Sequence, residues 1–178
     1  MSIIEAVTCM LETYLEQTAI NNSPKTSSLF FSKKVPNISI SSYLSRLKQY
    51  MKCSEECYIL ALIYIDRITS KHRSFTINTL CIHRLILTSV MVSAKFAEDT
   101  FYKNSYYAKV GGIPCSEMNM LEHQFLMMIE FELFVSDAEF NSYSTTLISH
   151  FGLSQNELTA DTIKNDQGMV KEGVASNV

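Results

Sequence analysis

The sequence lacks tryptophan and has only three prolines and five glycines in 178 residues. So few turn-forming residues argue against an all-β fold, in which they separate many short strands. The chain also lacks an excess of positive charge, because 15 basic residues face 18 acidic ones. Binding to nucleic acid or to an anionic membrane normally needs such an excess. We therefore expect neither among its partners.

Membrane and secretion signals are missing as well. The most apolar run, residues 81–97, contains Arg84 and Lys95 and is shorter than the roughly 20 residues that cross a bilayer. The N-terminus carries Glu5, Glu12 and Glu16 without a basic segment, unlike a signal peptide. Hydrophobic residues make up 47% of the chain, enough for a real core. We expect a soluble intracellular protein of the cytoplasm or nucleus.

The five cysteines are an odd number and lie mostly within apolar helical patterns. Cys53 and Cys57 are four residues apart, a spacing open to metal binding, but no second cysteine or histidine pair accompanies them. We expect buried free thiols, no metal site and no cofactor.

Apolar periodicity predicts helices along most of the chain, and strand signals are absent. The expected helices cover residues 3–18, 41–52, 54–70, 79–97, 104–111 and 114–131, with another from 136. Ser41 or Ser42 is the expected cap of the second helix, and Ser136 with Glu139 has the spacing of a capping box. Residues 19–40 are expected to form an extended connector with apolar anchors.

The stretch 79–97 is apolar on almost every side, as expected of a helix at the centre of a bundle. We predict an all-α fold: a five-helix bundle around this helix, with an extra N-terminal helix and a short C-terminal helix. We expect an N-terminal helix and connector in residues 1–27, the bundle in 28–135, a C-terminal helix in 136–158 and a flexible tail in 159–178.

Lys95 and Glu122 are charged residues inside the two most apolar helical stretches. Such groups either snorkel or pair at the edge of the core, or they lie where another protein covers them. On the helix 114–131, residues 118, 121, 125 and 128 form one apolar stripe, sufficient for the core. A second stripe runs beside it through Glu122, Leu126, Ile129 and Leu133. In a domain of this size, two stripes favour a partner surface.

Four segments in order resemble the cyclin box: YILALIYIDR (58–67), LTSVMVSAKFAED (87–99), YYAKVGG (106–112) and EMNMLEHQFLMMIEFEL (117–133). The opening Val35–Pro36 and Ile38–Ile40, with YYAKVGG, is most similar to the P/U-type cyclins related to the yeast phosphate-system cyclin. The resemblance covers about residues 28–135. It implies a single cyclin box, since about 44 residues follow Phe134, too few for a second repeat.

The resemblance implies a non-catalytic subunit that binds a cyclin-dependent serine/threonine kinase and activates it by holding its C-helix in the active position. Lys95 and Glu122 would reach main-chain groups of the kinase. The apolar contacts of that surface would be Phe96, Leu126, Phe131 and Leu133. Asp66 would pair with Arg46 as a structural tie. We expect a monomer in the absence of the kinase.

Two alternatives remain open. A cyclin-fold scaffold or adaptor of the transcription-factor type would bind DNA and protein without activating a kinase, and it would need a basic face. An all-α enzyme would need a catalytic constellation, but phosphate-loop, HExxH, GxSxG and kinase motifs are missing and the histidines are scattered. The segment Ser45–Gln49 departs from the MRAIL-type patch of many cyclins, so docking of RxL-type substrates there is not expected.

Overall fold

The computed structural model describes residues 2–18 and 28–151. These residues form seven helices and no strand, which confirms the predicted all-α fold. The helices are α1 (Ile3–Thr18), α2 (Ile40–Met51), α3 (Glu56–Lys71), α4 (Ile82–Ala97), α5 (Asn104–Gly111), α6 (Cys115–Met128) and α7 (Asp137–Phe151). The expected polar tail and part of the connector, residues 19–27, lie outside the described residues.

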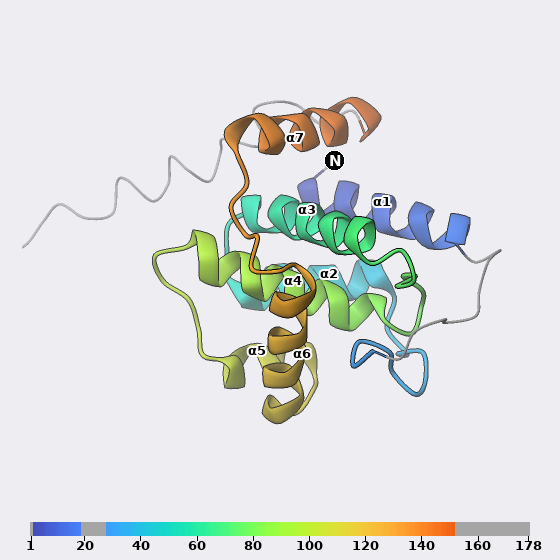
Figure 1. The fold of residues 1–178 in the computed structure, drawn as a ribbon, viewed down its shortest axis with the longest axis vertical. Coiled ribbons are helices and arrows are strands. Elements are labelled where there is room, and N and C mark those ends of the chain that lie inside the picture. The colour runs from blue at the N-terminus through green and yellow to red at the C-terminus, as the bar shows by residue number, and fades with distance from the viewer. Residues whose placement is uncertain (1, 19–27, 152–178) are drawn as a thin grey trace, which may run out of the picture.

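Helix α4 lies at the centre, as predicted, and packs against α2, α3, α5 and α6 (Figure 1). Leu85, Leu87 and Met91 on this helix are fully buried. The helix begins at Ile82 rather than at residue 79. The preceding residues form a turn instead, in which the Asn78 side-chain oxygen accepts a hydrogen bond from the Leu80 amide at 2.9 Å. This turn fixes the direction in which α4 enters the core.

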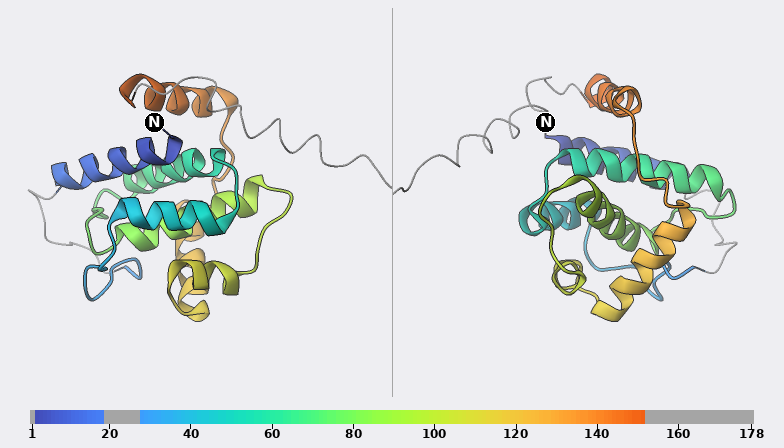
Figure 2. Two further views of the ribbon diagram at one scale, coloured as in Figure 1. Left: turned by 180° about the vertical axis from the view of Figure 1, so that it is seen from behind. Right: turned by 60° about the vertical axis from the view of Figure 1, so that its left-hand side comes forward.

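Helix α1 lies beside α3 on the outside of the bundle, and α7 packs across both (Figure 2). The residues Ile3, Ala6 and Val7 of α1 are buried, which confirms the predicted amphipathic N-terminal helix. The apolar face makes this helix part of the core rather than a separate arm. None of the helices in the described residues has the length and hydropathy needed to cross a membrane.

The helix ends show where local sequence signals were sufficient. Gly112 adopts a φ of 72° and ends α5, as expected for a glycine after a helix. The Ser136 hydroxyl accepts from the Glu139 amide at 3.3 Å, which confirms the predicted cap of α7. The cap of α2 is Ser39, whose hydroxyl accepts from the Ser42 amide at 3.1 Å. The prediction of Ser41 or Ser42 was wrong because α2 begins at Ile40, whose apolar side chain is buried in the core.

Candidate functional site

The side chains of Lys95 and Glu122 meet at the surface between α4 and α6. Lys95 comes from the last turn of α4 and Glu122 from the middle of α6, and the Lys95 Nζ lies 2.6 Å from Glu122 Oε1. The two side chains are 25% and 20% exposed. They form a partly buried ion pair that solvent or a partner molecule can still reach.

Asn104, the first residue of α5, connects this pair to a third helix. Its side-chain oxygen accepts a hydrogen bond from Lys95 Nζ at 2.6 Å. Its amide nitrogen donates to Glu122 Oε2 at 2.6 Å and to Asn119 Oδ1 at 2.8 Å. We call Lys95, Asn104, Asn119 and Glu122 the polar cluster. It holds three helices in register. It also gives both charges partners within the molecule, which agrees with the interpretation that they pair at the edge of the core.

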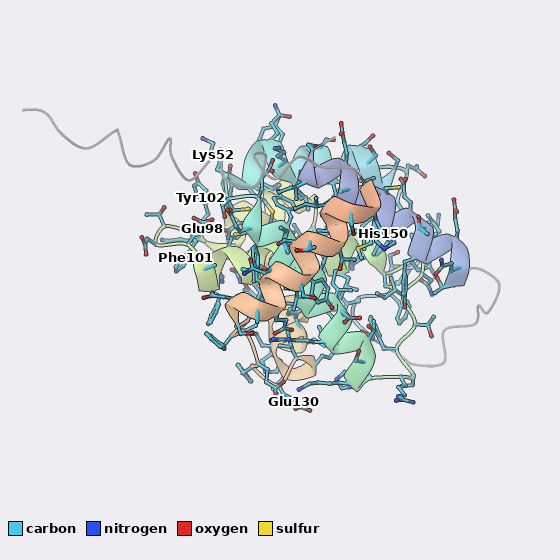
Figure 3. All side chains as sticks on the ribbon, turned by 90° about the horizontal axis from the view of Figure 1, so that it is seen from above. Lys52, Glu98, Phe101, Tyr102, Glu130 and His150 are labelled. Carbon is cyan, nitrogen blue, oxygen red and sulfur yellow. The ribbon has the colours of Figure 1, made fainter. Side chains whose placement is uncertain are left out.

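Large apolar side chains beside the polar cluster remain uncovered. Phe96 is 53% exposed and Phe131 is 62% exposed, while Leu126 and Leu133 are half-buried. Phe101 and Phe134 are further exposed aromatic residues close to them in the sequence. Figure 3 shows Glu98, Phe101 and Tyr102 together at one edge of the molecule. We call Lys95, Glu122, Phe96, Leu126, Phe131 and Leu133 the candidate interface.

Phe131 owes its exposure to the turn that follows α6. The helix was predicted to reach residue 131, but it ends at Met128 because Glu130 and Phe131 have φ angles of 58° and 57°. A left-handed conformation costs a side-chain-bearing residue about 1–2 kcal/mol. The strained turn therefore needs support from the rest of the fold.

Helix α3 gives that support. The Tyr64 hydroxyl donates to the Leu133 carbonyl at 2.8 Å, and Arg67 donates to the carbonyls of Glu132 and Phe134 at 2.7 and 3.0 Å. Arg67 also forms an ion pair with Glu139 of α7 at 2.7 Å. These contacts fix the backbone on which Phe131 and Leu133 are presented.

The structural ion pair expected between Arg46 and Asp66 does not form. Arg46 is exposed on α2 and donates to the Lys109 carbonyl of α5 at 3.3 Å. Asp66 instead accepts a hydrogen bond from the Tyr143 hydroxyl of α7 at 2.5 Å. The two side chains face different helices, and the neighbouring Arg67, together with Tyr64, ties α3 to the segment after α6.

The second apolar stripe of α6 is also corrected at one position. Ile129 is fully buried and joins Met118, Leu121 and Phe125 in the core, whereas Met128 is only half-buried. The change of direction after Met128 turns Ile129 inward. Of the predicted stripe, only Glu122, Leu126 and Leu133 are therefore partly exposed at the surface.

The cysteines are free thiols, as expected, but Cys9 and Cys115 are exposed rather than buried. Cys57 is buried and donates to Glu98 Oε1 at 3.3 Å, and its hydrogen bond with Cys53, together with burial, raises the pKa of its thiol. Within residues 2–18 and 28–151, no group of three potential metal ligands comes together.

Sequence patterns alone assign no functional role to Asn104 or Phe101. From the sequence, Asn104 is predicted only as the start of a short helix. A polar residue that closes a gap between two charges can be recognised only when the packing of α4, α5 and α6 is known.

Comparison with known proteins gives a consistent result. The family model described as Cyclin matches residues 5–133, a region that begins within α1. Cyclin-U4-1 of Arabidopsis thaliana is 41% identical over 162 residues, which are 86% of this chain and 80% of that protein. Cyclin-U4-3 of the same plant is 47% identical over 142 residues, with 80% and 65% covered. Cyclin-P4-1 of Oryza sativa subsp. japonica is 44% identical over 114 residues, with 64% and 54% covered.

Proposed function

This chain belongs to the cyclin family and is of its P/U type, and on that premise we propose that it binds and activates a cyclin-dependent serine/threonine kinase. Cyclins are regulatory, non-catalytic subunits, which supports a role without catalysis for this chain. The proposed contact surface is the candidate interface, from Lys95 and Glu122 to the exposed Phe96 and Phe131.

The observation that carries the proposal is a paired lysine and glutamate beside uncovered aromatic side chains. Exposed Phe96 and Phe131 are the residue type that is enriched in protein interfaces. Among the described residues, Lys95 uses two of its three N–H groups, and the Glu122 oxygens have further acceptor positions. Both charges can therefore bond main-chain groups of a partner while they keep each other neutralised, which limits the cost of covering them.

The proposed mechanism is a shift in the population of kinase conformations. The candidate interface is held by the polar cluster and by the bonds of Tyr64 and Arg67 to the turn after α6. A rigid surface that fits the inward position of the kinase C-helix binds the active kinase more tightly than the inactive one. That difference in affinity moves the equilibrium toward the active state.

The test begins with a pull-down and mass spectrometry that identify the bound kinase. The double variant Lys95→Ala, Glu122→Ala is then compared with the wild-type chain for binding and for kinase activation. We expect a loss of about 2–5 kcal/mol in binding free energy if both side chains bond buried groups of the kinase. Normal binding by this variant would remove the interface assignment.

A closely matched control lies at the other end of α4. Arg84 and Glu117 also form an ion pair of 2.6 Å between α4 and α6, with side chains 22% and 27% exposed. Arg84→Ala, Glu117→Ala should retain the kinase. An equal loss in both double variants would indicate a general effect on folding. Kinase binding without activation would instead support the adaptor alternative.

A further inference from the structure

A cleft of about 700 Å³ lies near the N-terminal end of α4. One wall is the non-helical segment 31–38, and the other is the turn Gly111–Ile113 between α5 and α6. Tyr43, His83 and Arg84 complete its lining. His83 and Lys95 are twelve positions apart on the same helix, a separation of about 18 Å along its axis. The cleft is thus separate from the candidate interface.

The segment 31–38 supplies six side chains to the cleft: Phe31, Ser32, Lys33, Lys34, Pro36 and Ile38. The segment is fixed at both ends: the Ser32 amide donates to the Leu80 carbonyl at 2.9 Å, and the Ile38 carbonyl accepts from His83 Nε2 at 2.8 Å. The opposite wall is open at Gly112, where an added Cβ would meet no atom within 4 Å. The cleft is therefore preformed and accessible.

The lining combines apolar surface with positive charge. Phe31, Pro36, Ile38 and Ile113 supply apolar side chains. Lys33 and Lys34 are exposed, and neither has an ion-pair partner within the described part of the chain. Arg84 is already neutralised by Glu117. Lys33 and Lys34 therefore place uncompensated positive charge beside the apolar part of the lining.

We propose that this cleft binds an acidic peptide segment of a protein other than the kinase. Carboxylates of the segment would pair with Lys33 and Lys34, and its apolar side chains would pack between Pro36, Ile38 and Ile113. The kinase and this segment could be bound at the same time. The proposal does not depend on the proposed function, because it uses different residues.

Other occupants fit the charge and the lining less well. A nucleic acid would bring many phosphates to two unpaired lysines, and it gains most of its affinity from numerous phosphate contacts. A free inorganic anion would use the lysines but leave the apolar walls uncovered. A peptide that alternates acidic and apolar side chains satisfies both parts of the lining.

The experiment selects short random peptides, displayed on phage, on the full-length chain and measures the enriched peptides by fluorescence anisotropy. We expect acidic peptides with interspersed apolar residues. The double variant Lys33→Glu, Lys34→Glu should bind them roughly 10- to 100-fold more weakly, because it replaces attraction by repulsion. Lys52→Glu is the control, since it reverses an exposed charge at the C-terminal end of α2, away from the cleft.

Three results would overturn the proposal: enrichment of neutral or basic peptides, equal binding of acidic peptides by the double variant, or no enriched peptide at all. Displacement of the peptide by inorganic phosphate or single-stranded RNA at similar concentrations would identify an anion or nucleic-acid site instead. The double variant Lys33→Glu, Lys34→Glu should still bind the kinase. Failure of the cleft proposal is therefore distinguishable from failure of the proposed function.

Discussion

The two ends of α4 carry almost the same ion pair in different surroundings. Arg84–Glu117 and Lys95–Glu122 both join α4 to α6, both have a separation of 2.6 Å, and their side chains are similarly exposed. The Lys95 end adds Asn104 and is bordered by exposed aromatic residues. The Arg84 end lies in a cleft beside two unpaired lysines.

The geometry of an ion pair alone therefore does not identify a binding surface. A partly exposed pair contributes only about 0–1 kcal/mol to folding in either place. The neighbours make the difference, because uncovered aromatic side chains favour a partner with an apolar surface, and free lysines favour an acidic one. We therefore expect two partner surfaces on one helix, each with its own chemistry.

The largest effect is expected from the exposed aromatic side chains at the Lys95 end. Phe131→Ala or Phe96→Ala should each weaken kinase binding by about 2 kcal/mol or more, because buried aromatic anchors dominate interface energies. The free energy of unfolding should change by less than about 0.5 kcal/mol, since both side chains are exposed in the free chain. Isothermal titration calorimetry and urea denaturation measure the two quantities.

Val35→Ala is the matched control, because Val35 is 52% exposed on the segment that forms the cleft wall. It should leave kinase affinity unchanged. If Val35→Ala weakened the kinase complex as much as Phe96→Ala does, the two ends of α4 could not be separate surfaces.

Local patterns in the sequence predicted the helices well. The spacing of apolar residues placed α1, and the almost uniformly apolar stretch 79–97 placed α4, because burial leaves its pattern within a single element. Gly112 and Ser136 marked helix ends because their effect is confined to a few neighbouring residues. The all-α architecture therefore followed from information local to each segment.

Contacts between helices were harder to predict from the sequence. Lys95 and Glu122 stood out because charge is rare in apolar helices, but their mutual bond and the role of Asn104 depend on how three helices pack. The expected Arg46–Asp66 pair was wrong for the same reason, since α5 and α7 supply the actual partners. The left-handed turn at Phe131 is stabilised by α3, which lies far away in the sequence.

A smaller effect is expected from Asn104, which acts through the charges that it positions. Asn104→Ala should weaken kinase binding roughly 10-fold, because Lys95 and Glu122 each lose a hydrogen bond that orients them. A double-mutant cycle with Glu122→Ala separates positioning from direct contact, since the two losses should not add if Asn104 acts through Glu122. Asn119→Ala, which removes only the outer bond of the polar cluster, should have less effect. Additive losses would contradict the positioning role.

Folding stability should respond weakly and about equally at the two ends of α4. Lys95→Ala and Arg84→Ala should each lower the free energy of unfolding by about 0.5–1 kcal/mol, because the two ion pairs have similar exposure and geometry. Urea denaturation of both variants at low and high salt measures this cost, which should shrink as salt screens the pairs. A loss several times larger at Lys95 alone would mean that the polar cluster mainly serves the fold.

The smallest effect should appear in the dependence of stability on pH, where the two ends of α4 respond in different ranges. Burial lowers the pKa of His83 below its ordinary 6.5. Burial also acts to raise the pKa of Glu98, but hydrogen bonds from Ser54 and Cys57 outweigh it and place that pKa below 4.5. In both cases the unfolded chain binds a proton more readily than the folded chain, so stability falls as the pH falls. The loss begins near pH 6.5 for His83 and near pH 4.5 for Glu98.

The variants His83→Gln and Glu98→Gln separate these two ranges. The urea midpoint of each variant is measured from neutral pH to below pH 4.5. His83→Gln should abolish the fall in stability that begins near pH 6.5, and Glu98→Gln should abolish the fall that begins near pH 4.5. His123→Gln is the control, because His123 is exposed on α6. If the stability of His83→Gln still fell with pH above pH 4.5, another group would be responsible for the proton uptake. The N-terminal end of α4 would then contribute no buried imidazole to the pH response, and the contrast between the two ends would rest on their surfaces alone.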